Sequence, residues 1–164
     1  MIEVVVVSRK HEAQDICSYE LACVDGNALP AFSAGAHIDV HLPGGLIRQY
    51  SLCNHPDEHH RYVIGVLRDP ASRGGSQSLH EQVNTGDQLR ISEPRNLFPL
   101  DDTARRSLLF AGGIGITPIL CMAERLAHSG ADFELHYCAR SNERAAFIER
   151  LHNASFSDRV FLHF

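Results

Sequence analysis

The sequence predicts a β-barrel followed by an incomplete doubly wound α/β domain, and two patterns along the chain support this fold class. Up to about residue 100, short strand-like segments are separated by Gly, Pro, Asn and Asp turn signals. From residue 107 onward, strands alternate with helices, which is typical of a parallel sheet with crossover helices. We therefore expect a barrel domain over residues 1–102 and the first part of an α/β domain over residues 103–164.

Six segments of the first part have the alternation or the composition of β-strands. Ile38, Val40 and Leu42, for example, alternate with polar residues and should face a core. Six short strands favour a closed antiparallel barrel, because closure leaves no exposed sheet edge. The strands are predicted at residues 1–10, 17–24, 37–42, 46–52, 61–67 and 87–92, with one short helix at 78–83.

The second part reads as three strands and two helices. Thr117 can cap the helix at 116–130, Pro118 suits its first turn, and Gly130 can end it. A doubly wound domain normally has about five or six strands. We therefore expect an incomplete domain in a protein that continues in its natural form. The strands are predicted at residues 107–113, 133–139 and 159–164, and the second helix at 143–151.

Composition and charge exclude several classes of protein. The net charge of −5 gives no electrostatic basis for binding nucleic acid. No apolar run approaches the roughly 18 residues that span a bilayer, and the N-terminus lacks the basic region of a signal peptide. We expect a cytoplasmic protein whose five cysteines are buried free thiols, since they form no C-x-x-C pair. These are Cys17, Cys23, Cys53, Cys121 and Cys138.

Histidines are numerous, but their pattern does not predict a metal site. His55, His59 and His60 lie in a polar turn, which is typical of a solvated loop. His37 and His41 share a strand face with Asp39, as on any solvent-facing strand.

Residues 48–52, Arg-Gln-Tyr-Ser-Leu, place polar side chains in a predicted strand. Alternate side chains share a face about 6–7 Å apart, so Arg48 and Tyr50 point the same way. A guanidinium can bind a phosphate through paired hydrogen bonds, and a phenol ring can stack on a flat ligand. Ser51 points to the other face unless the strand twists there. A solvated strand edge with a cation–π pair is the alternative.

Two glycine-rich turns could approach a ligand closely. Gly74, Gly75 and Ser76 precede a helix whose free amides would form an anion site, although an ordinary helix entry has the same appearance. The turn at residues 112–118, Gly-Gly-Ile-Gly-Ile-Thr-Pro, lies between a strand and a helix, where open α/β sheets bind nucleotides. It is neither G-x-G-x-x-G nor a P-loop, and a simple tight turn is the alternative.

Arg140, Ser141 and Arg144 follow the next predicted strand and should reach the same sheet edge, where they could meet a ribose or its phosphate.

Taken in order, residues 48–52, 73–78, 112–118 and 136–141 resemble the ferredoxin–NADP reductase superfamily. Within it, the match is to the phthalate dioxygenase reductase group, which includes vanillate O-demethylase reductases. The resemblance covers essentially the whole chain and implies a form truncated at its C-terminus. It also implies an FMN-binding barrel followed by a domain that binds a nicotinamide nucleotide.

The same resemblance assigns roles to individual residues. Arg48 would hold the FMN phosphate, Tyr50 would flank the isoalloxazine, and Ser51 would approach flavin N5 as the only candidate catalytic side chain. Further assignments are Val66 and Arg68 beside the flavin, Gly75, Ser76 and Ser78 at the phosphate, Thr117 toward the flavin, Gly112, Gly113, Gly115 and Ile116 at the nicotinamide and pyrophosphate, and Arg140 and Ser141 at the adenosine half.

The activity implied is hydride transfer from NADH or NADPH to FMN, with FAD less favoured, and delivery of single electrons to a terminal Rieske-type oxygenase that acts on an aromatic substrate. Members of the group carry a [2Fe–2S] ferredoxin domain that needs a C-x₄-C-x₂-C run. No such run occurs here, so we expect the cluster only in a longer chain. The alternatives are a non-catalytic electron-transfer module or an inactive fragment; an oligonucleotide-binding barrel is disfavoured by the charge.

Overall fold

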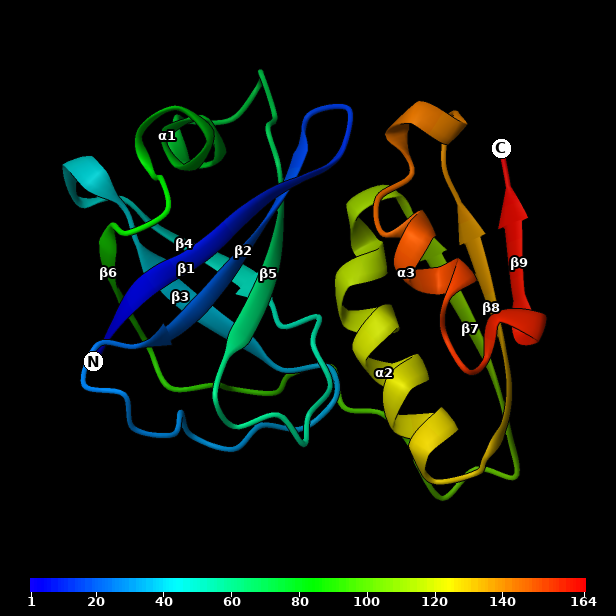
Figure 1. Ribbon diagram of the computed structural model, residues 1–164. Coiled ribbons are helices and arrows are strands. Elements are labelled where there is room, and N and C mark those ends of the chain that lie inside the picture. The colour runs from blue at the N-terminus through cyan, green and yellow to red at the C-terminus, as the bar shows by residue number, and fades with distance from the viewer.

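The computed structural model describes all 164 residues, and the chain forms two units that lie side by side (Figure 1). The first is a six-stranded antiparallel sheet with the strand order β4-β3-β6-β1-β2-β5. The second is a parallel sheet with the order β7-β8-β9. No helix combines the length and apolar character that a membrane crossing requires. The predicted fold class is confirmed.

The first unit curls into a barrel. An isolated bridge between Leu52 and Ile64 connects the two edge strands and brings the sheet close to closure. The alternation that predicted the strands is observed in β3, where Ile38 and Val40 are fully buried and the alternate residues His37, Asp39 and His41 are partly exposed. The elements are β1 (Ile2–Ala13), β2 (Ile16–Cys23), β3 (His37–His41), the 3₁₀ turn η1 (Pro43–Gly45), β4 (Ile47–Ser51), β5 (Tyr62–Leu67), α1 (Gly75–Gln82) and β6 (Gln88–Ile91).

Helix α1 begins three residues earlier than the predicted start at residue 78. Gly74 adopts a left-handed conformation, φ 95°, and takes the N-cap position without a side-chain cap. Because only glycine adopts this conformation at little cost, Gly74 turns the chain into the helix directly. Gly75, Ser76 and Ser78 therefore all lie within α1.

The second unit has the expected three strands and two helices, and both helices cover the sheet face that is turned toward the barrel (Figure 1). On the opposite face, the rings of Phe110, His136 and Phe161 stack with centroid separations of 5.2 and 4.9 Å. The elements are β7 (Arg106–Gly112), η2 (Gly113–Gly115), α2 (Ile116–His128), β8 (Asp132–Cys138), η3 (Asn142–Arg144), α3 (Ile148–His152), η4 (Ser157–Arg159) and β9 (Val160–His163).

Details of the two helices differ from the prediction. Helix α2 starts at Ile116 as predicted, but Thr117 does not cap it: Gly115 is at the N-cap position, and the Thr117 hydroxyl donates to the carbonyl of Ile114 at 3.2 Å. Gly130, φ 71°, follows the end of α2 as predicted. The second helix is shorter than residues 143–151, because Phe147 has a left-handed φ of 64° that interrupts helical geometry just before α3.

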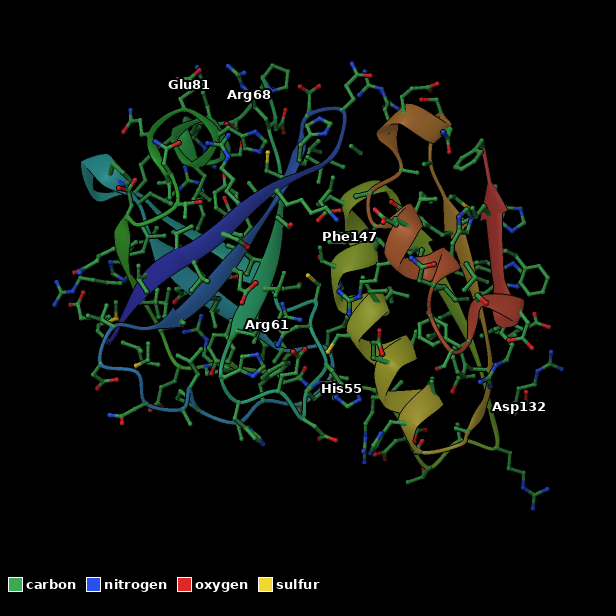
Figure 2. All side chains as sticks on the ribbon, in the orientation of Figure 1. His55, Arg61, Arg68, Glu81, Asp132 and Phe147 are labelled. Carbon is green, nitrogen blue, oxygen red and sulfur yellow. The ribbon has the colours of Figure 1, made fainter.

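A single apolar cluster joins the two units. It contains Ala13, Ile16, Ala34 and Cys53 of the barrel together with buried residues of α2, β8 and α3. At the centre of this contact, a Cβ built on Gly65 would lie 2.8 Å from Thr117 Cγ2 and 3.2 Å from the ring of Phe147, which projects toward the barrel (Figure 2). Direct packing of side chains therefore fixes the position of the barrel relative to the second unit.

The cysteines follow the prediction only in part. Cys17, Cys53 and Cys121 are buried free thiols, but Cys23 is partly accessible and Cys138 is exposed at the end of β8. Burial raises the pKa of Cys53 to about 11 and that of Cys121 to about 12, so both remain neutral thiols.

Candidate functional site

A pocket of about 770 Å³ lies between the two units. Its walls come from the β1–β2 turn, the end of β5, the glycine turn η2 and the residues that follow β8. Arg68, Gly113 and Arg140, which the sequence analysis singled out separately, all line it, and so does Arg144. The topology thus brings candidate residues of both units into one cleft.

The glycine turn leaves open space beside its backbone. A Cβ built on Gly112, Gly113 or Gly115 would have no atom within 4 Å. Packing within the protein therefore does not require glycine at these positions, although Gly113 has a φ of 53° that favours it. The open backbone is suited to the close approach of a ligand.

The arginines of the pocket differ in their partners. Arg68 pairs with Glu81 of α1 at 2.7 Å, and both side chains are labelled in Figure 2. Arg140 and Arg144 have no carboxylate within ion-pair distance, although Asp15 and Asp69 also line the pocket. Two unpaired guanidinium groups favour an anionic ligand here.

A second group of residues is a candidate anion site, which we call the anion cradle and define as Arg48, Gly75 and Ser78. Arg48 makes no ion pair, and its one hydrogen bond within the protein goes to the carbonyl of Ile47 at 2.8 Å. A Cβ on Gly75 would lie 2.6 Å from Arg48 Cγ and Nε, so the arginine packs directly on the start of α1. The first amides of a helix have no intrahelical partner, and the buried Ser78 hydroxyl has no hydrogen-bond partner.

Tyr50 and Arg48 share one face of β4, as strand alternation predicts, because they pair with the buried residues Ile38 and Val40 of β3. Tyr50 packs against the barrel core, and burial raises the pKa of its phenol to about 12, with Arg48 lowering it slightly. Tyr50 is therefore neutral. Ser51 pairs with His37 and points to the opposite face.

Several predicted site residues do not reach an open surface with their side chains. Val66 and Ile116 are fully buried in the two apolar clusters, so the contacts predicted for them would have to come from the backbone. Thr117 is almost fully buried against Gly65. For Val66 the cause is strand alternation, since its side chain points into the barrel while Leu67 and Arg68 reach the pocket.

Two serines are placed less directly than expected. The Ser76 hydroxyl accepts from the Asp69 amide at 3.1 Å and hydrogen-bonds to Ser72 at 3.2 Å, so its backbone amide is the group left for a ligand. Ser141 is a partly buried N-cap of η3, adjacent to Arg140 but outside the pocket lining.

Sequence reasoning missed the β1–β2 turn. Gln14 donates its amide to the carbonyl of Glu143 at 2.8 Å, and the carbonyl of Asp15 accepts the Arg68 amide at 2.7 Å. Gln-Asp between two strands indicates a hairpin, but nothing local shows that this turn docks on the second unit.

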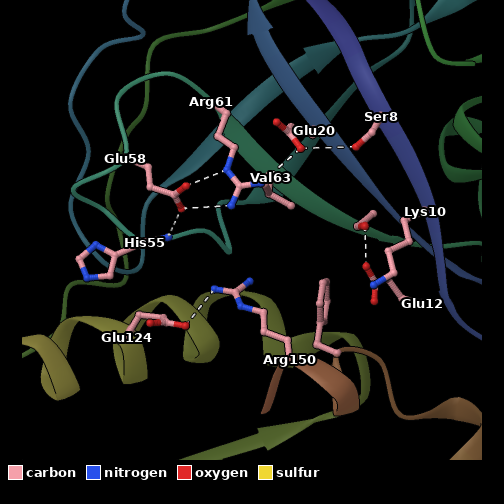
Figure 3. A pocket seen from close by; sticks show the side chains of 12 residues that line it. Ser8, Lys10, Glu12, Glu20, His55, Glu58, Arg61, Val63, Glu124 and Arg150 are labelled. Atoms are coloured by element: carbon pink, nitrogen blue, oxygen red, sulfur yellow. Dashed lines mark hydrogen bonds and ion pairs between the residues drawn. The ribbon is translucent and has the colours of Figure 1, made fainter. Parts of the chain in front are cut away.

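A second cleft of about 370 Å³ also lies between the barrel and α2, and both of its arginines are paired with carboxylates of its lining (Figure 3). Arg61 pairs with Glu58 at 2.8 Å and with Glu20 at 3.2 Å, while Arg150 pairs with Glu124 at 3.4 Å. Paired side chains of this kind are typical of a solvated interface rather than a ligand site.

A six-stranded barrel packed on a parallel α/β unit is the ferredoxin reductase-like fold of the solved structures that resemble this chain. No protein-family profile matches the chain. It is 77% identical over 164 residues to the vanillate O-demethylase oxidoreductase of Pseudomonas putida, covering 100% of this chain and 51% of that protein. It is 46% identical to the phthalate 4,5-dioxygenase oxygenase reductase subunit of Pseudomonas putida, covering 96% and 49%.

Among solved structures, phthalate dioxygenase reductase superposes with a TM-score of 0.95 at 44% identity, covering 99% of this chain and 51% of that one. That protein is described as a modular structure for electron transfer from pyridine nucleotides to [2Fe–2S]. The chain is thus related along its whole length to the phthalate dioxygenase reductase group. It spans about half the length of the curated relatives it matches.

Proposed function

We propose that the chain binds FMN along the barrel edge and a nicotinamide nucleotide at the glycine turn, as the flavin and nucleotide part of a reductase that supplies electrons to a Rieske-type oxygenase. The observation that carries this proposal is the anion cradle. It combines an unpaired guanidinium, the open start of a helix and an unpartnered buried hydroxyl at one end of the barrel.

The cradle fits a phosphate monoester. Arg48 would donate paired hydrogen bonds to its oxygens, and the amides of Gly75 and Ser76 would donate from the N-terminus of α1. The buried Ser78 hydroxyl, which has no partner within the protein, would donate a hydrogen bond to the same phosphate. Tyr50, two residues along the same strand face, would flank the flat ring system of the same ligand. The Arg-x-Tyr-Ser-Leu and Gly-Gly-Ser combination supports FMN over FAD, as the resemblance implies.

The interdomain pocket fits the second ligand. A nucleotide pyrophosphate can approach the open backbone of Gly113, and Arg140 and Arg144 can meet the phosphates or the ribose at the adenosine end. Both arginines are compatible with the 2′-phosphate of NADPH, and neither requires it. The choice between NADH and NADPH is therefore left to the reduction experiment below.

The chain's task in catalysis is to position its two ligands. A bound flavin supplies the chemistry of accepting a hydride and releasing electrons singly. The contact of Thr117 with Gly65 fixes the spacing of the units, and the apolar cluster keeps water out of their interface. Ser51, at the last position of β4, is proposed to hydrogen-bond near flavin N5, which requires the chain to twist beyond Tyr50.

Electrons would leave through an iron–sulfur centre on another part of a longer protein, because the five cysteines here lack the C-x₄-C-x₂-C spacing. Several relatives are named as reductase components of aromatic oxygenases or demethylases, which supports the class of partner.

The test is spectroscopic. The purified chain is saturated with FMN, and NADH or NADPH is added without oxygen. We expect a yellow complex whose long-wavelength absorption bleaches. A chain that binds no FMN refutes the proposal, whereas one that binds FMN but does not bleach supports the alternative of a non-catalytic electron-transfer module.

A further inference from the structure

A cluster of metal-ligating side chains lies at the junction of the two units, away from the flavin and nucleotide sites. His55 and Asp57 belong to the loop between β4 and β5, and His128 is the last residue of α2. Their candidate ligand atoms all lie within 4.8 Å of one another. We propose that these three residues, the interdomain triad, bind a divalent transition-metal cation such as Zn²⁺ and tie the barrel to α2.

The distances suit one small cation. Asp57 Oδ2 lies 4.0 Å from His55 Nδ1 and 3.6 Å from His128 Nε2. Ligand bonds of about 2.1 Å in tetrahedral geometry place ligand atoms about 3.4 Å apart. Binding would therefore draw the groups together by less than about 1.5 Å. Asp57 and His128 can move this far, because each side chain is 62% exposed.

His55 is prepared for this role by its surroundings. Its Nδ1 accepts the Asp57 amide at 3.0 Å, so a cation bound at this nitrogen would replace that hydrogen bond. Its own amide donates to Glu58 at 3.1 Å, and Arg61 holds the Glu58 carboxylate at 2.8 Å (Figure 3). One ligand is thus oriented before any cation arrives.

The donor set favours particular metals. Two imidazoles and one carboxylate suit Zn²⁺, Co²⁺, Ni²⁺ or Cu²⁺ rather than Mg²⁺ or Ca²⁺, which prefer oxygen ligands. Three protein ligands leave a position for water. The rings of His55 and His128 are edge to face with centroids 5.2 Å apart, so the two units already meet here. A cation bound by ligands from both units would stabilise their contact.

The experiment uses tag-free protein stripped with a chelator and then titrated with ZnCl₂ by calorimetry in a non-chelating buffer. We expect one site per chain. His128→Ala and Asp57→Asn each remove or alter a proposed ligand. Each should weaken Zn²⁺ binding by roughly tenfold or more, which is at least the loss caused by removing a hydrogen-bond partner of a metal ligand. His152→Ala, which removes an exposed histidine of α3, is the matched control and should bind as the parent chain does.

A melting experiment reports on the tie between the units. Saturating Zn²⁺ should raise the melting temperature of the parent chain and of His152→Ala, because a ligand that binds only the folded state stabilises it. It should raise the melting temperature of His128→Ala less, because the weaker site stabilises the folded state less at the same Zn²⁺ concentration. Equal binding by His128→Ala and His152→Ala, or no stoichiometric binding at all, overturns the proposal and leaves Asp57 and the histidines as a surface ion-pair cluster. FMN binding is not required for either outcome.

Discussion

Replacing Arg48 with alanine tests the anion cradle most directly. The side chain packs on Gly75, makes no ion pair and donates only to the adjacent Ile47 carbonyl, so the fold depends little on it. We therefore expect the free energy of unfolding to change by no more than about 0.5 kcal/mol. A hydrogen bond to a charged group contributes about 1.5–3 kcal/mol, which corresponds to a rise in the Kd for FMN of roughly 10- to 150-fold.

The assay is quenching of flavin fluorescence on binding, at one fixed ionic strength because salt screens charge contacts. Riboflavin, which lacks the phosphate, should bind the Arg48→Ala variant as it binds the parent chain. Arg73→Ala removes an exposed arginine of the loop between β5 and α1 and serves as the matched control. An unchanged Kd for FMN, or equal losses for FMN and riboflavin, refutes the assignment of the phosphate to Arg48.

Gly75→Ala should weaken FMN binding by about tenfold in the same titration. The new Cβ would lie 2.6 Å from Arg48 Cγ and Nε and would therefore push the arginine side chain away. Gly113→Val should slow flavin reduction by NADH in a stopped-flow assay more than it weakens FMN binding, because it fills the open backbone. Glu58→Gln should lower the free energy of unfolding in urea near pH 7, and this effect should disappear as the pH falls through the depressed folded-state pKa of Glu58. Burial raises the pKa of Glu58, but the hydrogen bond and the charge of Arg61 lower it by more, so its pKa in the folded state is depressed. A carboxylate with a depressed folded-state pKa stabilises the protein at pH values above its unfolded-state pKa. This stabilisation is lost as the pH falls through the folded-state pKa.

Each of these variants has an outcome that contradicts its reasoning. Normal FMN affinity in Gly75→Ala would mean that Arg48 has room to move without leaving the ligand. Equal loss of reduction and FMN binding in Gly113→Val would indicate a folding defect, since a β-branched residue at positive φ is itself strained. A Glu58→Gln effect that stays constant with pH would exclude the carboxylate charge as its source.

Local patterns sufficed for the elements whose neighbours in space are also neighbours in sequence. Period-two alternation identified β3 through Ile38 and Val40, and the change to strand–helix alternation marked the second unit. The side-by-side placement of Arg48 and Tyr50 also follows from strand geometry alone. Their association with Gly75 does not, because β4 and α1 meet only through the closure of the barrel.

Side-chain positions that depend on residues distant in sequence could not be predicted in this way. Val66 and Ile116 were assigned by analogy to the ligand site, yet strand and helix periodicity turn both side chains into the apolar clusters. His55 was interpreted with its loop neighbours His59 and His60, whereas its partner in space is His128, from the other unit. Sequence proximity carries no information on such pairs.

Gly65 has a consequence for any attempt to recombine this chain with a relative. The Thr117 methyl occupies the gap where a side chain at position 65 would lie, and Phe147 borders the same gap. A larger residue there would push the two units apart and change the shape of the pocket between them. Hybrid reductases should therefore inherit positions 65, 117 and 147 from one parent, however similar the remaining surfaces are.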